Sequence, residues 1–216
     1  MFAKSTLLRF FPTCVWVFDL VPGDAQALSA AIIKTVESAL PPASKLPRDH
    51  SLQSGTHLHE LPEFKPLVTH ALDAGREILK NLGHEPAPME MTGCWANISV
   101  PDARHGEHSH PNNYLSGVYY VKTPKGGDSI NFYDPRPQAH VVAPHVATFS
   151  PNHASSVHVE VQPGRLVLFP GWLRHSVDPN RGDGVRMSIA FNLMFSDYTA
   201  QQSRPRFKGD FLTRDS

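Results

Sequence analysis

The sequence predicts a mainly β domain, either a barrel or a sandwich, that is supported by two helices near the N-terminus. From about residue 89 the chain consists of short β-type runs separated by turn residues, and no helical pattern interrupts them. This pattern favours antiparallel β structure over an alternating α/β fold. Twenty prolines among 216 residues indicate many short elements, and 40% hydrophobic residues are enough for a buried core.

The N-terminal region is expected to hold one strand and two helices. The apolar run 10–20 contains a proline and an aspartate, which argue against a signal peptide, and we interpret it as a buried strand. Asp24 is expected to cap a first helix that ends before Pro41. A second helix is expected from Pro62 to a cap at Gly83. Each helix has one apolar stripe, so both should pack against the sheet.

The whole chain is expected to form one domain with three parts. Residues 1–88 are expected to brace the barrel, 89–196 to form its core and 197–216 to form a C-terminal tail. The stretch 137–156 lacks periodicity and contains several histidines, which is typical of a lid or binding loop and equally of a disordered segment. Strands are expected at residues 89–100, 115–123, 129–133, 157–161, 165–169 and 185–195.

Charge and cysteine usage argue against several classes of protein. The formal net charge is zero and no basic run exceeds two residues, so nucleic acid is not an expected partner. No apolar stretch reaches the ~18 residues of a membrane span, so a membrane partner is not expected either. The two cysteines form no CxxC pair, which is typical of reduced thiols in the cytoplasm.

Two histidines at alternate positions give the strongest local signal for a metal site. His108 and His110 flank Ser109, and in an extended segment residues i and i+2 point to the same side. Both imidazoles could therefore reach one ion. The spacing alone is a weak signal, because such pairs also arise by chance on surfaces and His105 shows that this region is rich in histidine.

A second signal is found downstream, where His175 precedes a strand with an arginine on one face. In the predicted strand 185–195, apolar residues occupy one face, whereas Arg186 and Ser188 occupy the other. A buried guanidinium needs an anionic partner to offset its desolvation. Either an internal carboxylate or a bound dicarboxylate would supply that partner, the latter through a two-pronged contact.

Taken in order, these segments resemble the iron(II)- and 2-oxoglutarate-dependent oxygenase superfamily, in a bacterial and phage branch related to the prolyl hydroxylases. Most characterised relatives have an HxD motif, a later histidine and an RxS motif about ten residues after it. The resemblance extends from Trp95 to Asn192. It is carried by the runs HSHPN at 108–112, LSGVYYV at 115–121, FYDPR at 132–136, LFPGWLRH at 168–175 and RMS at 186–188.

The resemblance implies a double-stranded β-helix, a jelly-roll or cupin-like barrel, that uses Fe(II), 2-oxoglutarate and O2, with ascorbate as a supporting reductant. It implies a hydroxylase that decarboxylates 2-oxoglutarate to succinate. His108 and His175 match the family's two histidine ligands, and His110 stands where the carboxylate ligand belongs. The residues matched to cosubstrate binding are Arg186 and Tyr120 on the distal carboxylate, Ser188 of the RxS motif and, more distantly, Asn97 and Asn192.

Other interpretations stay open at this point. Three histidines also suit a zinc hydrolase or hydratase, or a cupin-type iron dioxygenase, and the barrel could be a non-catalytic binding module. Asp134 is the competing third ligand, against its interpretation as a turn residue paired with Arg136. The expected prime substrate is a small molecule or a protein side chain. The sequence is compatible with a homodimer but identifies no interface for one.

Overall fold

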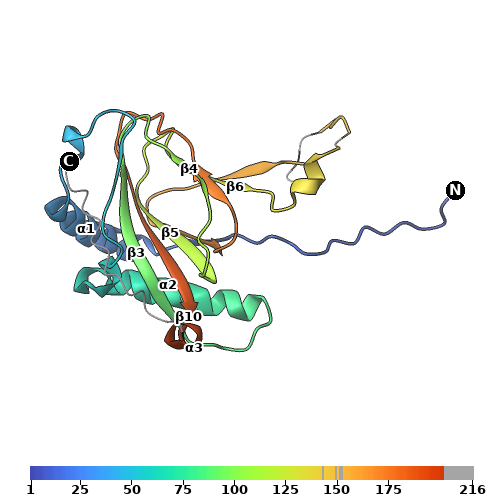
Figure 1. The fold of residues 1–216 in the computed structure, drawn as a ribbon, viewed down its shortest axis with the longest axis horizontal. Coiled ribbons are helices and arrows are strands. Elements are labelled where there is room, and N and C mark those ends of the chain that lie inside the picture. The colour runs from blue at the N-terminus through green and yellow to red at the C-terminus, as the bar shows by residue number, and fades with distance from the viewer. Residues whose placement is uncertain (143, 149, 151–152, 202–216) are drawn as a thin grey trace.

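The computed structural model describes residues 1–142, 144–148, 150 and 153–201, and in this part of the chain two antiparallel sheets form the core (Figure 1). The larger sheet has the order β1-β8-β5-β10-β3-β2, and the smaller sheet has the order β4-β9-β6-β7. The larger sheet comprises β1 (Trp16–Asp19), β2 (Ser51–Gln53), β3 (Met89–Ser99), β5 (Leu115–Lys122), β8 (Arg165–Pro170) and β10 (Arg186–Phe195). The smaller sheet comprises β4 (His105–His108), β6 (Ser129–Tyr133), β7 (Ser156–Glu160) and β9 (His175–Val177).

From β3 to β10 the chain crosses repeatedly between the two sheets. β3, β5, β8 and β10 belong to the larger sheet, whereas β4, β6, β7 and β9 belong to the smaller one. This winding is that of a double-stranded β-helix, so the predicted fold class is confirmed. Residues of both sheets form a second buried cluster, which consists of Tyr120, Ile130, Phe132, Val161, Val167, Phe169 and Leu173.

Two helices, α1 (Pro22–Ala39) and α2 (Lys65–Asn81), cover the outer face of the larger sheet (Figure 1). Their apolar stripes share one core cluster with the outward side chains of β10. The members from the helices include Leu28, Ile32, Val36, Leu67, Ala71 and Ile78, and those from β10 are Met187, Ile189, Phe191 and Leu193. The short helices are η1 (Ala43–Lys45), η2 (Leu58–Glu60), η3 (Pro62–Phe64), η4 (Pro137–His140) and α3 (Ser196–Gln201).

The helix ends differ in how well they follow the sequence signals. Gly83 adopts φ 74°, the left-handed conformation of a C-terminal cap, and the His84 amide donates to the Leu79 carbonyl at 2.9 Å. The expected cap at Asp24 is wrong, because α1 begins at Pro22 and its N-cap residue, Val21, makes no side-chain capping bond. Asp24 lies instead in the first turn, where its charge favours the positive end of the helix dipole.

The prediction of a buried strand over residues 10–20 is wrong for its first half. Only Trp16–Asp19 forms a strand, whereas Phe10 and Phe11 are 70% and 94% exposed. Pro12 disfavours sheet pairing at its own position, because it has no amide hydrogen. The segment that precedes β1 extends away from the body of the molecule (Figure 1).

The six predicted strands are present, and their ends differ from the prediction by at most one residue. The two predicted helices are also present, as α1 and α2. The stretch 137–156 includes η4 and leads away from the barrel (Figure 1), and none of its described residues lines the cavity between the sheets. Positions 143, 149, 151 and 152, like residues 202–216 of the expected tail, lie outside the described residues. Within the described part of the chain, the helices are too short or too polar to cross a membrane.

Candidate metal and cosubstrate site

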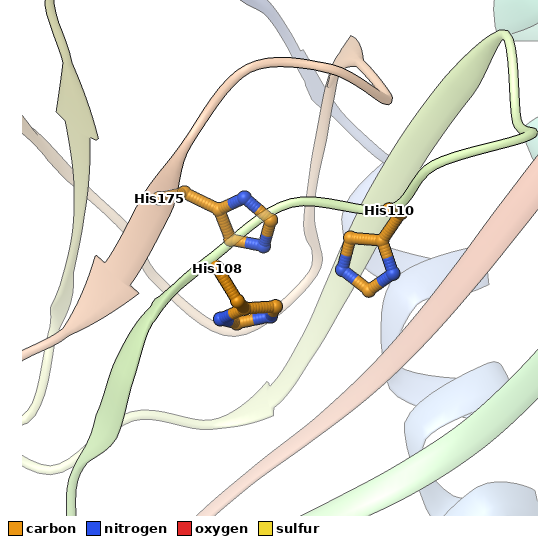
Figure 2. A group of neighbouring side chains, drawn as sticks. All are labelled: His108, His110 and His175. Carbon is orange, nitrogen blue, oxygen red and sulfur yellow. The ribbon is translucent and has the colours of Figure 1, made fainter.

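Three histidines from different segments meet between the sheets (Figure 2). His108 ends β4 and His175 begins β9, and the two residues are direct partners in the antiparallel ladder. Residues paired in this way bring their side chains together on one face. His110 follows in the next loop, where its amide donates to the Gly171 carbonyl at 2.8 Å. One ligand atom from each histidine lies within 4.8 Å of the others.

The surrounding backbone selects which ring nitrogen each histidine presents. His108 Nδ1 lies 2.8 Å from the Gly106 carbonyl, and His175 Nδ1 lies 3.0 Å from the Leu173 carbonyl. A carbonyl only accepts, so each Nδ1 carries the proton, and Nε2 keeps the lone pair that a metal needs. Such outer hydrogen bonds fix the ring orientation of metal-binding histidines.

Burial keeps two of the imidazoles neutral. Desolvation lowers the pKa of His175 to about 4, and desolvation with the nearby His108 lowers the pKa of His110 to about 4. Both rings are therefore uncharged at pH 7, which is the form that binds a metal. The neutral donors, their mutual distances and their fixed tautomers fit a divalent transition metal such as Fe(II).

Asp134, the competing third ligand, takes part in a turn instead. Its Oδ1 accepts from the amide and Nε of Arg136, and its Oδ2 accepts from Arg136 Nη2, each at 2.9 Å. Among the described residues, Asp134 is not part of the group formed by the three histidines. The sequence interpretation of a turn carboxylate paired with Arg136 thus agrees with these contacts.

A cavity of about 250 Å³ borders the three histidines. Arg186 and Ser188 of β10 and Tyr120 of β5 line its wall, so alternation along both strands does turn these side chains inward. Arg186 is 3% exposed, and its Cζ lies 5.4 Å from the centre of the Tyr120 ring. A cationic group is therefore buried in the wall of the same cavity that the three histidines border.

Two buried donors in this cavity have no hydrogen-bond partner among the described residues. Tyr120 Oη and Arg186 Nε make no hydrogen bond, and no carboxylate of the described residues lies within ion-pairing distance of Arg186. Burial raises the pKa of Tyr120 to about 12, so the phenol keeps its proton. Unpaired buried donors are costly, and a carboxylate ligand would satisfy both of them. The residues present thus fit the distal carboxylate of a dicarboxylate such as 2-oxoglutarate.

The two asparagines named from the sequence differ in position. Asn97 lines the cavity. Asn192 lies outside the cavity lining, and its Oδ1 accepts a hydrogen bond from Ser116 Oγ at 2.8 Å. Lining residues that sequence reasoning missed include Trp95 and Ser99 on β3 and His105 on β4. Alternation from Asn97 would have found the first two, whereas no sequence signal separates His105 from its histidine-rich surroundings.

A second group of potential ligands lies on η2 and the residue before it. His57, His59 and Glu60 also bring one ligand atom each within 4.8 Å of the others. The side chains of His57 and Glu60 are 73% and 69% exposed, and His57 Nδ1 lies 3.6 Å from Glu60 Oε1. This group is therefore a surface cluster, whereas the first group borders a cavity.

Comparison with known proteins identifies the barrel. Residues 93–192 match a family model described as "Putative 2OG-Fe(II) oxygenase". No curated protein sequence matches the chain. Solved structures with the same fold include the α-ketoglutarate-dependent carbocyclase SnoK of nogalamycin biosynthesis. That match has a TM-score of 0.60 and 15% identity, over 92% of this chain and 90% of that chain.

Two further matches come from bacteria. A prolyl-4-hydroxylase of Pseudomonas putida matches with a TM-score of 0.55 and 16% identity, over 85% of this chain and 93% of its own. HygX of Streptomyces hygroscopicus, solved with nickel and 2-oxoglutarate bound, matches with a TM-score of 0.59 and 14% identity. The match covers 85% of this chain and 83% of HygX. The family match runs through the barrel from β3 to β10 and includes the three histidines and Arg186. Over residues 93–192 the chain thus matches the 2OG-Fe(II) oxygenase family model, and its barrel has the fold of enzymes that use α-ketoglutarate.

Proposed function

We propose that the barrel binds Fe(II) through His108, His110 and His175, and binds 2-oxoglutarate with its distal carboxylate on Arg186 and Tyr120. The observation that carries this assignment is the pair of unsatisfied buried donors, Tyr120 Oη and Arg186 Nε, in the cavity that the histidines border. A zinc hydrolase or a three-histidine cupin needs no buried cation at that place. Arg186 therefore favours the 2-oxoglutarate enzyme over both alternatives.

Each residue has a separate task in this proposal. Arg186 attracts the dicarboxylate and fixes its far end by charge-assisted hydrogen bonds, while Tyr120 donates a further hydrogen bond. Ser188, 7% exposed on the same face of β10, supplies a hydroxyl beside them, and Asn97 supplies a neutral amide. The apolar cluster behind the cavity excludes water from this end. When bound, iron supplies the oxidation: O2 and 2-oxoglutarate yield succinate and CO2 while one C–H bond of the substrate becomes C–OH.

The size of the cavity limits how the prime substrate reaches the site. At about 250 Å³ the cavity is smaller than the ~300–1,000 Å³ of typical small-molecule pockets. The cosubstrate takes most of this space, so the prime substrate presents only its reacting group. HygX has been solved with hygromycin B bound, and a Trichoplax adhaerens prolyl hydroxylase with a peptide fragment. We propose a small molecule or a protein side chain as the substrate of this chain.

Succinate formation tests the proposal directly. Purified protein is incubated with Fe(II), ascorbate, O2 and 2-oxoglutarate, and succinate is quantified with the Arg186→Ala variant as the matched control. We expect slow succinate formation by the wild type, because uncoupled turnover proceeds without a prime substrate, and none above background by the variant. A wild-type protein that binds iron but neither binds nor consumes 2-oxoglutarate would contradict the proposal and favour a three-histidine enzyme of another class.

The proposal also includes the cellular compartment and the domain organisation of the protein. Cys14 and Cys94 are both free, and burial raises the pKa of Cys94 to about 12, so its thiol is unreactive. We propose a reducing compartment, the cytoplasm, on this ground. We also propose one folding unit in which residues 1–88 brace the barrel of residues 89–196, without nucleic-acid or membrane partners. Light scattering would show whether that unit forms a homodimer.

A further inference from the structure

The end of the cavity that holds Arg186 has a second polar wall, formed by Ser99 and His105. Ser99 is the direct partner of Arg186 in the β3–β10 ladder, and it is 2% exposed. His105 comes from β4 in the opposite sheet, and its Nε2 lies 3.3 Å from Ser99 Oγ. Both residues line the cavity together with Arg186. The two sheets therefore converge on this end with hydrogen-bonding groups from each side.

His105 is close enough to Arg186 for their charges to interact. Desolvation, followed by the positive charge of Arg186, lowers the pKa of His105, so the imidazole stays neutral. A neutral imidazole has one donor nitrogen and one acceptor nitrogen. If the Ser99 hydroxyl donates to Nε2, the proton resides on Nδ1. The hydrogen bond that His105 makes within the described part of the chain uses Nε2, which leaves its Nδ1 available to a ligand.

We propose that His105, oriented by Ser99, is a second anchor for the distal carboxylate of 2-oxoglutarate, on the wall opposite Arg186 and Tyr120. This inference rests on the proposed function and adds a cosubstrate-binding residue to it. The carboxylate would then be held from both sheets rather than from the β5–β10 side alone. A 2-oxo acid without that carboxylate would lose the contacts with Arg186 and Tyr120 on one wall and the contact with His105 on the other. His105 therefore contributes to selection among 2-oxo acids.

A merely structural role for His105 makes a different prediction. If its ring only fills space between β4 and β3, its loss should weaken every ligand of the cavity to a similar degree. If it anchors the distal carboxylate, its loss should weaken 2-oxoglutarate alone. The informative comparison ligand is 2-oxopentanoate, which has the same chain length but a methyl group in place of the distal carboxylate.

The experiment measures binding of both ligands to Ni(II)-loaded protein by calorimetry, so that no turnover is required. Removing one hydrogen bond to a carboxylate should weaken 2-oxoglutarate binding by about tenfold. We expect this loss for His105→Phe, which keeps a ring of similar size, with no change for 2-oxopentanoate. His105→Gln retains an N–H donor and should restore most of the affinity. Ser99→Ala, which frees the ring, should give an intermediate loss.

Three outcomes would overturn the inference or the function beneath it. Equal losses for both ligands in His105→Phe and His105→Gln would make His105 a packing residue. Unchanged 2-oxoglutarate affinity in both variants, with a loss in Arg186→Ala, would remove His105 from the site and leave the proposed function intact. A wild-type protein that takes up Ni(II) but not 2-oxoglutarate would overturn the proposed function itself. Thermal melting of each variant identifies any that fails to fold. If one of the two His105 variants does not fold, the other one tests the inference.

Discussion

Two groups of histidines in this chain share the same spacing and differ in their surroundings. His108 and His110 are two residues apart, as are His57 and His59, and each pair has a third potential ligand within 4.8 Å. In the first group, backbone carbonyls fix the rings of His108 and His175, and His175 is 4% exposed. The spacing of the histidines therefore suggests a metal site. The fixed rings of His108 and His175 and the burial of His175 distinguish the stronger candidate, in which His108 is exposed.

The second group lacks this support. His57 and Glu60 are mostly exposed, and the buried Nδ1 of His59 has no hydrogen-bond partner. Lys65 lies nearby, with its Nζ donating to the His59 carbonyl at 3.2 Å, and its positive charge opposes a bound cation. Exposed side chains must also lose rotamer entropy to hold an ion. We therefore expect iron to prefer the first group.

The largest expected effect is that of removing His175, which is the most buried of the three histidines in the first group. Changes in the outer hydrogen bonds of metal ligands alone cost about 10- to 100-fold in affinity, so loss of the ligand should cost at least ~100-fold. Anaerobic titration of His175→Ala with Fe(II) checks this expectation. His59→Ala, from the second group, is the matched control. Wild-type affinity in His175→Ala would show that iron binds elsewhere.

The next effect separates the two candidates for the third ligand. His110→Ala should weaken iron binding by at least ~10-fold, whereas Asp134→Ala should leave it unchanged, because Asp134 is engaged by Arg136. Both variants are titrated under the same conditions as His175→Ala. The opposite pattern would give the third position to Asp134 and return the site to two histidines and one carboxylate.

Arg186 tests whether the cavity beside the first group is built for a dicarboxylate. A charge-assisted contact is worth ~1.5–3 kcal/mol, so Arg186→Ala should weaken 2-oxoglutarate binding by roughly 10- to 100-fold. Iron affinity should remain as in the wild type, because Arg186 is not part of the group formed by the three histidines. Arg186→Lys keeps the charge but not the two-pronged geometry. Its affinity for 2-oxoglutarate should lie between those of the wild type and Arg186→Ala. Equal affinities in all three proteins would assign Arg186 to another anion.

The smallest expected effect is none at all, and it concerns the second group. The double variant His57→Ala and His59→Ala should bind one Fe(II) per chain, as we expect of the wild type. Metal content after dialysis is the measurement. A fall from two ions to one would show that exposed histidines beside a lysine also hold iron, and the contrast drawn between the two groups would then be incorrect.

Sequence patterns predicted long elements better than short ones. Alternation identified β3, β5 and β10, because each has a buried face over several residues. It missed β4 and β9, which are four and three residues long and polar, since only pairing between distant segments makes them strands. Alternation placed Arg186 correctly. It could not show that His108 and His175 are ladder partners, nor that His105 lies across the cavity from Arg186.

Arg186, which has no counter-ion among the described residues, links the level of bound 2-oxoglutarate to the folding equilibrium. Burying a charge without a counter-ion destabilises the native state, and the nearby Tyr120 ring offsets only part of that loss. A ligand that binds only the folded chain adds about 2.7 kcal/mol of stability at a hundred times its dissociation constant. On this basis 2-oxoglutarate should raise the melting temperature. Removal of 2-oxoglutarate should lower the melting temperature again and increase the fraction of unfolded chain that a protease can cleave.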